Sequence, residues 1–310
     1  MEKVTRWVFV WLFACGSPAE SSRPAPPPCP VAGETAADCP WAGVAREAAT
    51  DPRVALQRDA PTIVAELSRD AKAPAVLATW GLALNYNQKP DGSFGADPIV
   101  APAIVDELSS LAGVAPRRDR VVHAGVQHTY GYLFSVLATP YGFKRARWVQ
   151  RTIDNGFGLP DGTIAPVAVA GTLLGNVTWL AGSIAFAGEP ELGAARSDLS
   201  IVSPALQALD ISALHIKRLS ETVSVAGRTV VLRTDFVELP HPSPDATTLL
   251  VYSIRDGATS RLVTMFPINA KSRDTYEGVP LGDQIPITTQ YNAWVDGLTG
   301  TTIPGNRQLH

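Results

Sequence analysis

The last third of the chain contains two pairs of segments in which apolar and polar residues alternate. Such alternation is typical of strands with one buried face, and a short glycine-containing connection joins neighbouring antiparallel strands. The pairs are residues 211–225 with 228–239, around Ala226-Gly227, and residues 248–254 with 261–268, around Asp256-Gly257. We therefore expect antiparallel hairpins here. Strands do not alternate with long helices anywhere in the chain, so a parallel sheet is not expected.

The middle of the chain shows the same alternation of apolar and polar residues. Residues 121–138 and 143–149 alternate and are separated by a turn at 139–142. Helical spacing of apolar residues appears earlier, over residues 61–71 and 102–111. The sequence predicts a mainly β fold, an antiparallel barrel-like or sandwich sheet with a few short helices toward the N-terminal side. This single β-rich domain would span residues 46–310, with a possible helical subregion at 46–118.

The first residues have the pattern of a secretory signal. Lys3 and Arg6 precede an apolar run over residues 7–14. The run is too short for a spanning helix, which needs roughly 20 apolar residues. Residues 165–187 come nearest to such a helix later in the chain, but Pro166 and Asn176 interrupt them, so a buried strand pair or helix is expected there. Residues 1–14 are therefore interpreted as a signal peptide, and the globular part as exported.

The segment Leu12-Phe13-Ala14-Cys15 resembles the cleavage box of bacterial lipoproteins. This resemblance implies that Cys15 becomes the lipid-modified first residue of the mature protein. The membrane would then be a partner through the lipid anchor. Gly16, rather than aspartate, follows the cysteine, and by the same resemblance this implies the outer membrane of the cell envelope.

Residues 15–45 are predicted to form a proline-rich tether. A run such as Pro26-Pro27-Pro28 favours extended geometry and cannot bury a core. All three cysteines lie within the first 40 residues. In an oxidising compartment Cys29 and Cys39 would form a disulfide; the alternative is two free cysteines. No metal site is expected, because zinc requires a cluster of ligands and no histidine lies near this pair.

Charge excludes one class of partner. The whole chain has a net charge of −3, and loss of residues 1–14 would make it −4, because Glu2, Lys3 and Arg6 leave with them. A net negative charge argues against nucleic acid as a partner.

The candidate site lies in the strand predicted over residues 127–135. On a regular strand His128, Tyr130 and Tyr132 would share one face. His128 could act as a base and the tyrosines as hydrogen-bond donors, so these three are the candidate catalytic residues. The alternative is that aromatic residues with polar tips fill a half-buried sheet face. His123 would point to the opposite face, so a metal site with His128 would need a bulge near Gly125.

The following segment holds the densest positive charge. Lys144, Arg145 and Arg147 are the candidate ligand-binding residues, because two guanidinium groups on one strand face could hold a carboxylate or phosphate. The alternatives are a charged edge strand that prevents aggregation and contact with an anionic membrane surface.

Three classes of function remain. The first is a tethered cell-envelope lipoprotein that binds a small anionic or amphipathic molecule in a β-sheet pocket. The second is an envelope enzyme, a hydrolase or isomerase that uses His128, although no familiar catalytic signature is present. The third is a structural or interaction lipoprotein. The pattern identifies no cofactor and does not decide whether the protein is an enzyme.

Overall fold

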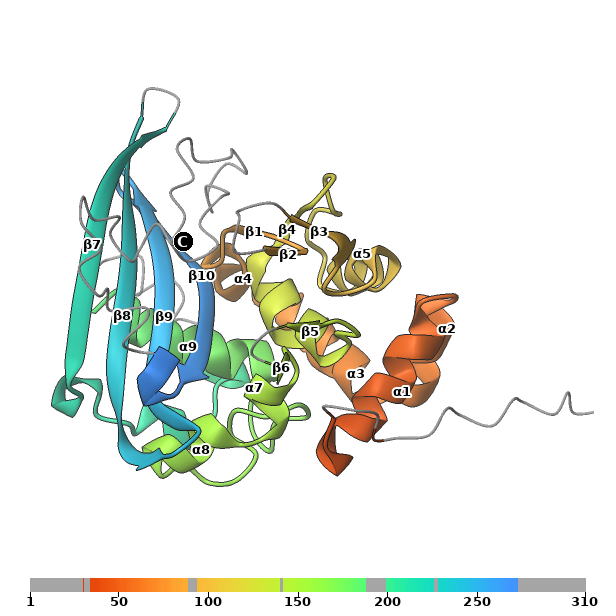
Figure 1. Cartoon of the computed structure of the whole chain (residues 1–310), viewed down its shortest axis with the longest axis horizontal. Helices are drawn as coiled ribbons and strands as arrows, with labels where there is room; N and C mark the ends of the chain where they lie inside the picture. Colours follow the sequence, from red (N-terminus) through yellow and green to blue (C-terminus); the bar gives the residue numbers. More distant parts are fainter. Residues whose placement is uncertain are drawn as a thin grey trace, which may run out of the picture.

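The computed structural model describes residue 30 and residues 34–88, 94–139, 142–187, 199–225 and 228–272. A helical part comes first along the chain, and a four-stranded antiparallel sheet comes last, at the opposite side of the molecule from α1 and α2 (Figure 1). Helical elements hold more of the described residues than strands do, and the sheet does not close into a barrel within the described residues. The predicted mainly β fold is therefore wrong.

The helical elements occupy most of the chain up to residue 213. They are η1 (Ala36–Asp38), α1 (Cys39–Ala48), α2 (Pro52–Asp59), α3 (Pro61–Asp70), α4 (Pro74–Ala78), α5 (Pro102–Leu111), α6 (Ala124–Val126), the π-helical turn η2 (Gln127–Gly131), α7 (Ala146–Val149), α8 (Thr152–Phe157), α9 (Leu173–Ala185), η3 (Leu199–Ile201), α11 (Pro204–Gln207) and η4 (Ile211–Ala213). The helices predicted over 61–71 and 102–111 are confirmed as α3 and α5. Helix α1 begins inside the range predicted as a tether and buries Ala42 and Ala45.

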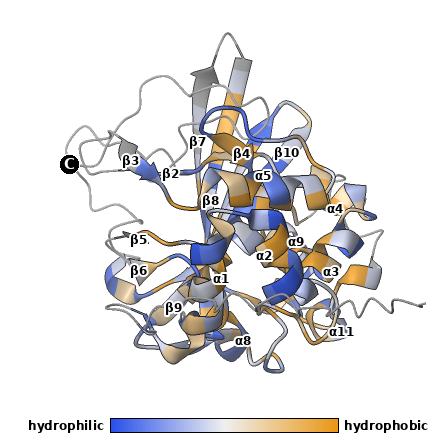
Figure 2. Ribbon diagram, turned by 90° about the vertical axis from the view of Figure 1, so that its right-hand side faces the viewer, coloured by the Kyte–Doolittle hydropathy of each residue, from blue (hydrophilic) through white to orange (hydrophobic). Residues whose placement is uncertain are grey.

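Proline begins many of these helices. It is the first residue of α2, α3, α4, α5 and α11. Proline suits this position because its fixed φ matches the helix and its missing N–H would have no intrahelical partner. In α3, hydrophobic and hydrophilic residues alternate at helical spacing (Figure 2), and Ile63 and Leu67 are fully buried. The start of each such helix is thus a local property of the sequence.

Six short strands pair among the helices. β1 (Leu82–Leu84) pairs with β4 (Val121–His123), β2 (Tyr86–Gln88) with β3 (Phe94–Pro98), and β5 (Ala138–Thr139) with β6 (Gly142–Phe143). All three pairs are antiparallel. The predicted strand over residues 121–138 therefore survives only at its two ends.

The large sheet is a meander in the order β10-β9-β8-β7. Its strands are β7 (Ile216–Val225), β8 (Arg228–Ser243), β9 (Ala246–Asp256) and β10 (Thr259–Ile268). Both predicted hairpins are confirmed, except that the first strand begins at Ile216 and not at residue 211, because residues 211–213 form η4. Val225 pairs with Arg228, and Asp256 pairs with Thr259, which leaves two-residue turns. Gly257 has a φ of +59°, a conformation that favours glycine.

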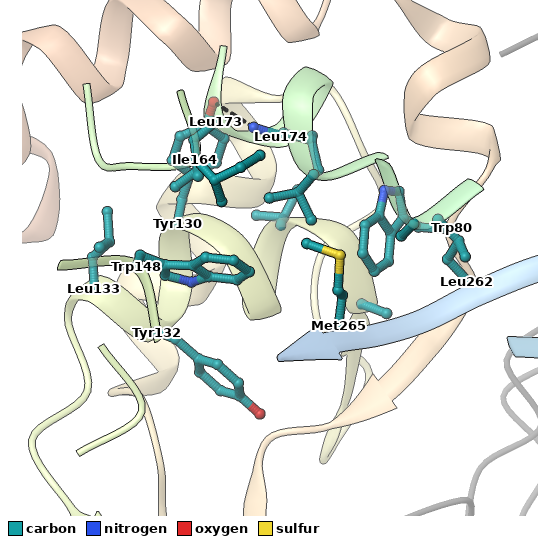
Figure 3. Close-up of a cluster of buried hydrophobic side chains, with 14 of the residues drawn as sticks. Trp80, Tyr130, Tyr132, Leu133, Trp148, Ile164, Leu173, Leu174, Leu262 and Met265 are labelled. Atoms are coloured by element: carbon teal, nitrogen blue, oxygen red, sulfur yellow. Dashed lines mark hydrogen bonds between the residues drawn. The ribbon is translucent and has the colours of Figure 1, made fainter. Parts of the chain in front are cut away.

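Helix α9 packs against this sheet and connects it to the N-terminal helices α1 to α5. Every residue of α9 except Trp179 is buried. Of the two structures expected within residues 165–187, a buried strand pair or a buried helix, the helix is therefore the one that forms. One hydrophobic core cluster contains Leu56 of α2, Leu180 of α9 and Met265 of β10. Figure 3 shows part of this cluster between Trp80, Trp148 and Met265.

Two arginines of the sheet hold the C-terminal end of α9. Arg218 donates hydrogen bonds to the carbonyl oxygens of Ile184 and Ala185 at 3.0 and 3.2 Å, and Arg233 donates to Ala185 at 2.8 Å. Asp235 accepts from Nε of Arg218 at 2.5 Å. Cationic side chains are favoured at a helix C-terminus, because the last carbonyl groups lack intrahelical partners. These contacts fix α9 relative to β7 and β8.

Candidate functional site

The three candidate catalytic residues lie on helical turns, not on a strand. Residues 127–131 form η2, and Tyr132 caps it. In a helical turn, residues two apart point in nearly opposite directions, whereas residues four apart share a side. His128 and Tyr132 accordingly lie together, with ring centroids 4.9 Å apart. Tyr130 points the other way, toward Leu173 and Leu174 (Figure 3). The expected common face for all three residues is wrong.

Burial explains why the sequence pattern of this segment did not reveal that it is helical. Residues 124–135 are all buried, so no solvent-facing side defines a period. A fully buried run of this kind cannot be assigned to strand or helix from its pattern alone. Aromatic and β-branched residues favour strands only weakly, and tertiary packing overrides that preference.

His128 is a neutral imidazole held by the sheet. Its Nδ1 lies 2.5 Å from the carbonyl oxygen of Val263 in β10, so Nδ1 carries the proton and donates it. Burial lowers the pKa of His128 well below its usual value, and Arg147 lowers it further. The neutral ring therefore keeps its lone pair on Nε2, which can accept a hydrogen bond.

Arg147 is positioned by the same strand and by aromatic rings. Its Nη1 donates to Oγ1 of Thr264 at 3.2 Å and to the carbonyl oxygen of Met265 at 3.4 Å. Its guanidinium lies over the rings of Tyr132 and Phe266, 4.8 and 4.9 Å from their centroids. Both of its hydrogen bonds within the described residues use Nη1, and the side chain is 8% exposed. The Nε and Nη2 donors are thus not used by any partner in the described part of the chain.

Lys144 adds a second basic group beside Arg147. It lies half-buried in the turn between β6 and α7. Burial and, to a smaller extent, the charge of Arg147 together lower the pKa of Lys144 to about 7. No acidic group is among the causes that shift the pKa of Lys144 or His128.

We call His128, Lys144 and Arg147, with the rings of Tyr132 and Phe266, the cationic cluster. Its members come from η2, the turn before α7, α7 itself and β10, so four segments build it. Among the described residues no carboxylate forms an ion pair with Lys144 or Arg147. Basic groups that are buried or half-buried without an acidic partner can bind an anion from outside the chain.

Arg145 is not part of this cluster. Its guanidinium forms ion pairs with Glu34 and Asp38 and donates to the carbonyl oxygen of Ser135. Because residues 146–149 are helical, Arg145 and Arg147 point in different directions, and the predicted strand face that both would share is wrong. Arg145 instead ties the N-terminal elements to the rest of the molecule.

Tyr130 belongs to a second buried polar site that the sequence reasoning missed. Its hydroxyl lies 2.6 Å from Oδ2 of Asp70 and 3.0 Å from Oε2 of Glu66. A signal was present, because Glu66 and Asp70 are four residues apart and fall on the apolar face of a predicted helix, beside Ile63 and Leu67. Charged residues on an apolar helix face are buried only with partners.

Cys39 is disulfide-bonded. Both other cysteines, Cys15 and Cys29, lie outside the described residues. The lipid modification predicted at Cys15 and the predicted signal peptide lie outside them as well. His123 and His128 form no joint site, and the described residues contain no group of three metal-ligating side chains.

No helix within the described ranges is long and apolar enough to cross a membrane. No protein family, curated protein or solved structure matches this chain. The function must therefore be argued from the site.

Proposed function

We propose that this protein binds a small carboxylate- or phosphate-bearing molecule at the cationic cluster. The observation that carries this proposal is that Arg147 is oriented through Nη1 alone, while Lys144 lies beside it and neither forms an ion pair within the described residues. The remaining edge of a guanidinium group matches the two oxygens of a carboxylate or phosphate. An anion would also raise the pKa of Lys144, because a negative charge nearby favours the protonated amine.

The surroundings favour a ligand with an apolar portion. The rings of Tyr132 and Phe266 flank Arg147 and exclude water from it. An anion beside a ring-covered guanidinium is bound more strongly than at an open surface, because the local dielectric constant is lower. Nε2 of His128 can accept a hydrogen bond from a ligand hydroxyl or amide group.

Binding is favoured over catalysis by the way His128 is held. A general base in a catalytic pair is normally oriented by an acidic group, whereas a backbone carbonyl orients His128. Burial keeps the ring neutral, and two cations lie nearby. Among the described residues the cluster thus supplies charge and hydrogen bonds, but no acidic group that orients His128 as a base.

Substitution of Arg147 tests the binding site. Arg147→Met is expected to weaken the binding of sulfate and acetate, measured by titration calorimetry, by about 10- to 100-fold, because a charged hydrogen bond contributes about 1.5–3 kcal/mol. The matched control is Arg151→Met, which removes the same charge from a side chain that is 54% exposed and paired with Asp161. Equal affinity in both variants, or no binding of either anion by the wild-type protein, would refute the proposal.

The resemblance of residues 12–15 to a lipoprotein box supports a further part of the proposal, that the binding domain is anchored to the cell envelope through Cys15. Cys15→Ser is expected to move the protein from the membrane fraction to the soluble fraction when cells are fractionated. Cys29→Ser is the control and should leave the protein with the membranes. Membrane association of the Cys15→Ser variant would contradict lipid anchoring.

A further inference from the structure

Two carboxyl groups and one phenol meet in a buried site between α3, η2 and the start of α9. Glu66 and Asp70 are 2% and 0% exposed, and Tyr130 between them is fully buried. The Tyr130 hydroxyl contacts both carboxyl groups, at 3.0 and 2.6 Å. A phenol has a single proton to donate. One of these two contacts is therefore a hydrogen bond only if a carboxyl group itself carries a proton.

The other partners show which carboxyl group is ionised. Both oxygens of Glu66 accept backbone N–H groups at 2.8 Å, from Ala168 and from Leu173. These donors, of which Leu173 is the first residue of α9, stabilise a negative charge. Within the described residues the Asp70 side chain accepts one donor besides the phenol, Oγ1 of Thr172 at 2.5 Å. The proton consequently resides on Asp70, which donates to Tyr130, and Tyr130 donates to Glu66.

We propose that Glu66 and Asp70 hold one proton through Tyr130, and that this proton is a pH-sensitive latch that keeps residues 165–172 closed on α3. With the proton present, each group in the series of hydrogen bonds that runs from Thr172 through Asp70 and Tyr130 to Glu66 has a partner. Without it, two negative charges share a phenol that can satisfy only one of them. The two negative charges then repel each other in a site without water, and opening of the segment that carries Ala168 and Thr172 would admit water to them, although the hydrogen bond from Thr172 to the ionised Asp70 opposes the opening.

Few other charges act on the pair. Arg69 of α3 lowers the pKa of both carboxyl groups. Neither α4, α9 nor residues 162–172 contain a charged residue. In the two remaining helices that pack against α3, the charged residues are exposed in α2, namely Arg53, Arg58 and Asp59, and half-buried in α5, namely Asp106 and Glu107.

The latched segment stores backbone strain that its opening would release. Val167 has a φ of +60°, a conformation that β-branched residues rarely adopt, and it is 42% exposed. Val169 is 81% exposed. The hydrogen bond from Ala168 to Glu66 lies between these two residues and holds them in place. Strain of this kind persists only where the surrounding contacts impose it.

The direction of the pH effect follows from burial. Burial raises the pKa of Asp70 from 3.8 to about 6 and raises that of Glu66 as well, more than their hydrogen bonds lower it. A carboxyl group with a raised pKa contributes stability that is complete below about pH 4 and is lost as the pH rises through about 6. The latch is therefore closed in acid and loosened above about pH 6.

Amide substitutions distinguish the two carboxyl groups. Asp70→Asn imitates the protonated acid, because its NH2 group can donate to Tyr130 while its oxygen accepts from Thr172. Glu66→Gln places an NH2 group against the N–H of Ala168 or Leu173 and is expected to destabilise the protein at every pH. Urea unfolding between pH 4 and 8 measures both effects on the full-length protein.

We expect the unfolding constant of the wild-type protein, relative to that of Asp70→Asn, to rise by about 100-fold across this range, which corresponds to a shift of about two pKa units. Asp161→Asn, on an exposed carboxyl group, should retain the wild-type pH dependence. The infrared band of a protonated carboxyl group at pH 5 should be lost in Asp70→Asn even if Glu66→Gln does not fold. A pH dependence or an acid band that persists unchanged in Asp70→Asn would overturn the proposal.

Discussion

Replacing Arg145 with methionine is expected to lower the free energy of unfolding by about 3–5 kcal/mol, the usual cost of breaking a buried ion pair by removing one partner. The Arg145 side chain is fully buried and the side chains of Glu34 and Asp38 are each 3% exposed. The substitution removes the Arg145 cation from these two carboxylates in a site that water does not reach. It also removes the donor to the Ser135 carbonyl group and the stacking over Phe143, whose centroid lies 4.1 Å from the guanidinium carbon.

Urea denaturation at pH 7 followed by circular dichroism measures this loss. Arg151→Met is the matched control, because it breaks an exposed ion pair with Asp161 and should cost less than about 1 kcal/mol. A second variant, Arg145→Met with Asp38→Asn, should recover part of the stability, since one uncompensated charge is removed. Equal effects of Arg145→Met and Arg151→Met would show that Arg145 does not hold the N-terminal elements in place.

Asp154→Ala is expected to cost about 3 kcal/mol, because a buried backbone N–H group left without a partner costs about 1–3 kcal/mol and water can satisfy part of the loss. The buried carboxylate of Asp154 accepts three successive backbone N–H groups, from Gly162, Thr163 and Ile164, at 2.9, 3.1 and 2.7 Å. It thereby fixes the turn that follows α8.

Thermal and urea unfolding of Asp154→Ala and Asp154→Asn measure this effect. The asparagine variant should be intermediate, because its oxygen accepts part of the donors while its NH2 group faces the rest. Asp161→Ala removes an exposed carboxylate from the same segment and should change stability by less than about 1 kcal/mol. If Asp154→Ala were as mild as Asp161→Ala, the turn at residues 162–164 would not depend on this carboxylate.

The cationic cluster was only partly accessible from the sequence. The density of positive charge near residue 147 and the aromatic residues around His128 both pointed to this region. The structure brings His128, Lys144, Arg147 and Tyr132 together and takes Tyr130 and Arg145 away. Which of these residues come together follows from helical geometry, because side chains on a helix turn by about 100° per residue instead of alternating between two faces.

The buried acid pair shows why the remaining contacts could not be derived. Tyr130 lies 60 residues from Asp70 and 64 from Glu66 in the sequence. Helical spacing places the two carboxyl groups on one face, but it does not say what covers that face. Partners so distant in sequence are chosen by packing of whole elements.

The sequence by itself determined the features that depend on neighbouring residues. These are the proline starts of α3 and α5, and the two hairpins, whose register follows from their two-residue turns. Only the tertiary structure decided the helical state of residues 124–133 and the separation of the two polar sites on that segment. The physical reason is burial on all sides, because a segment without a solvent-facing side has no period in its sequence and takes its conformation from the elements that surround it.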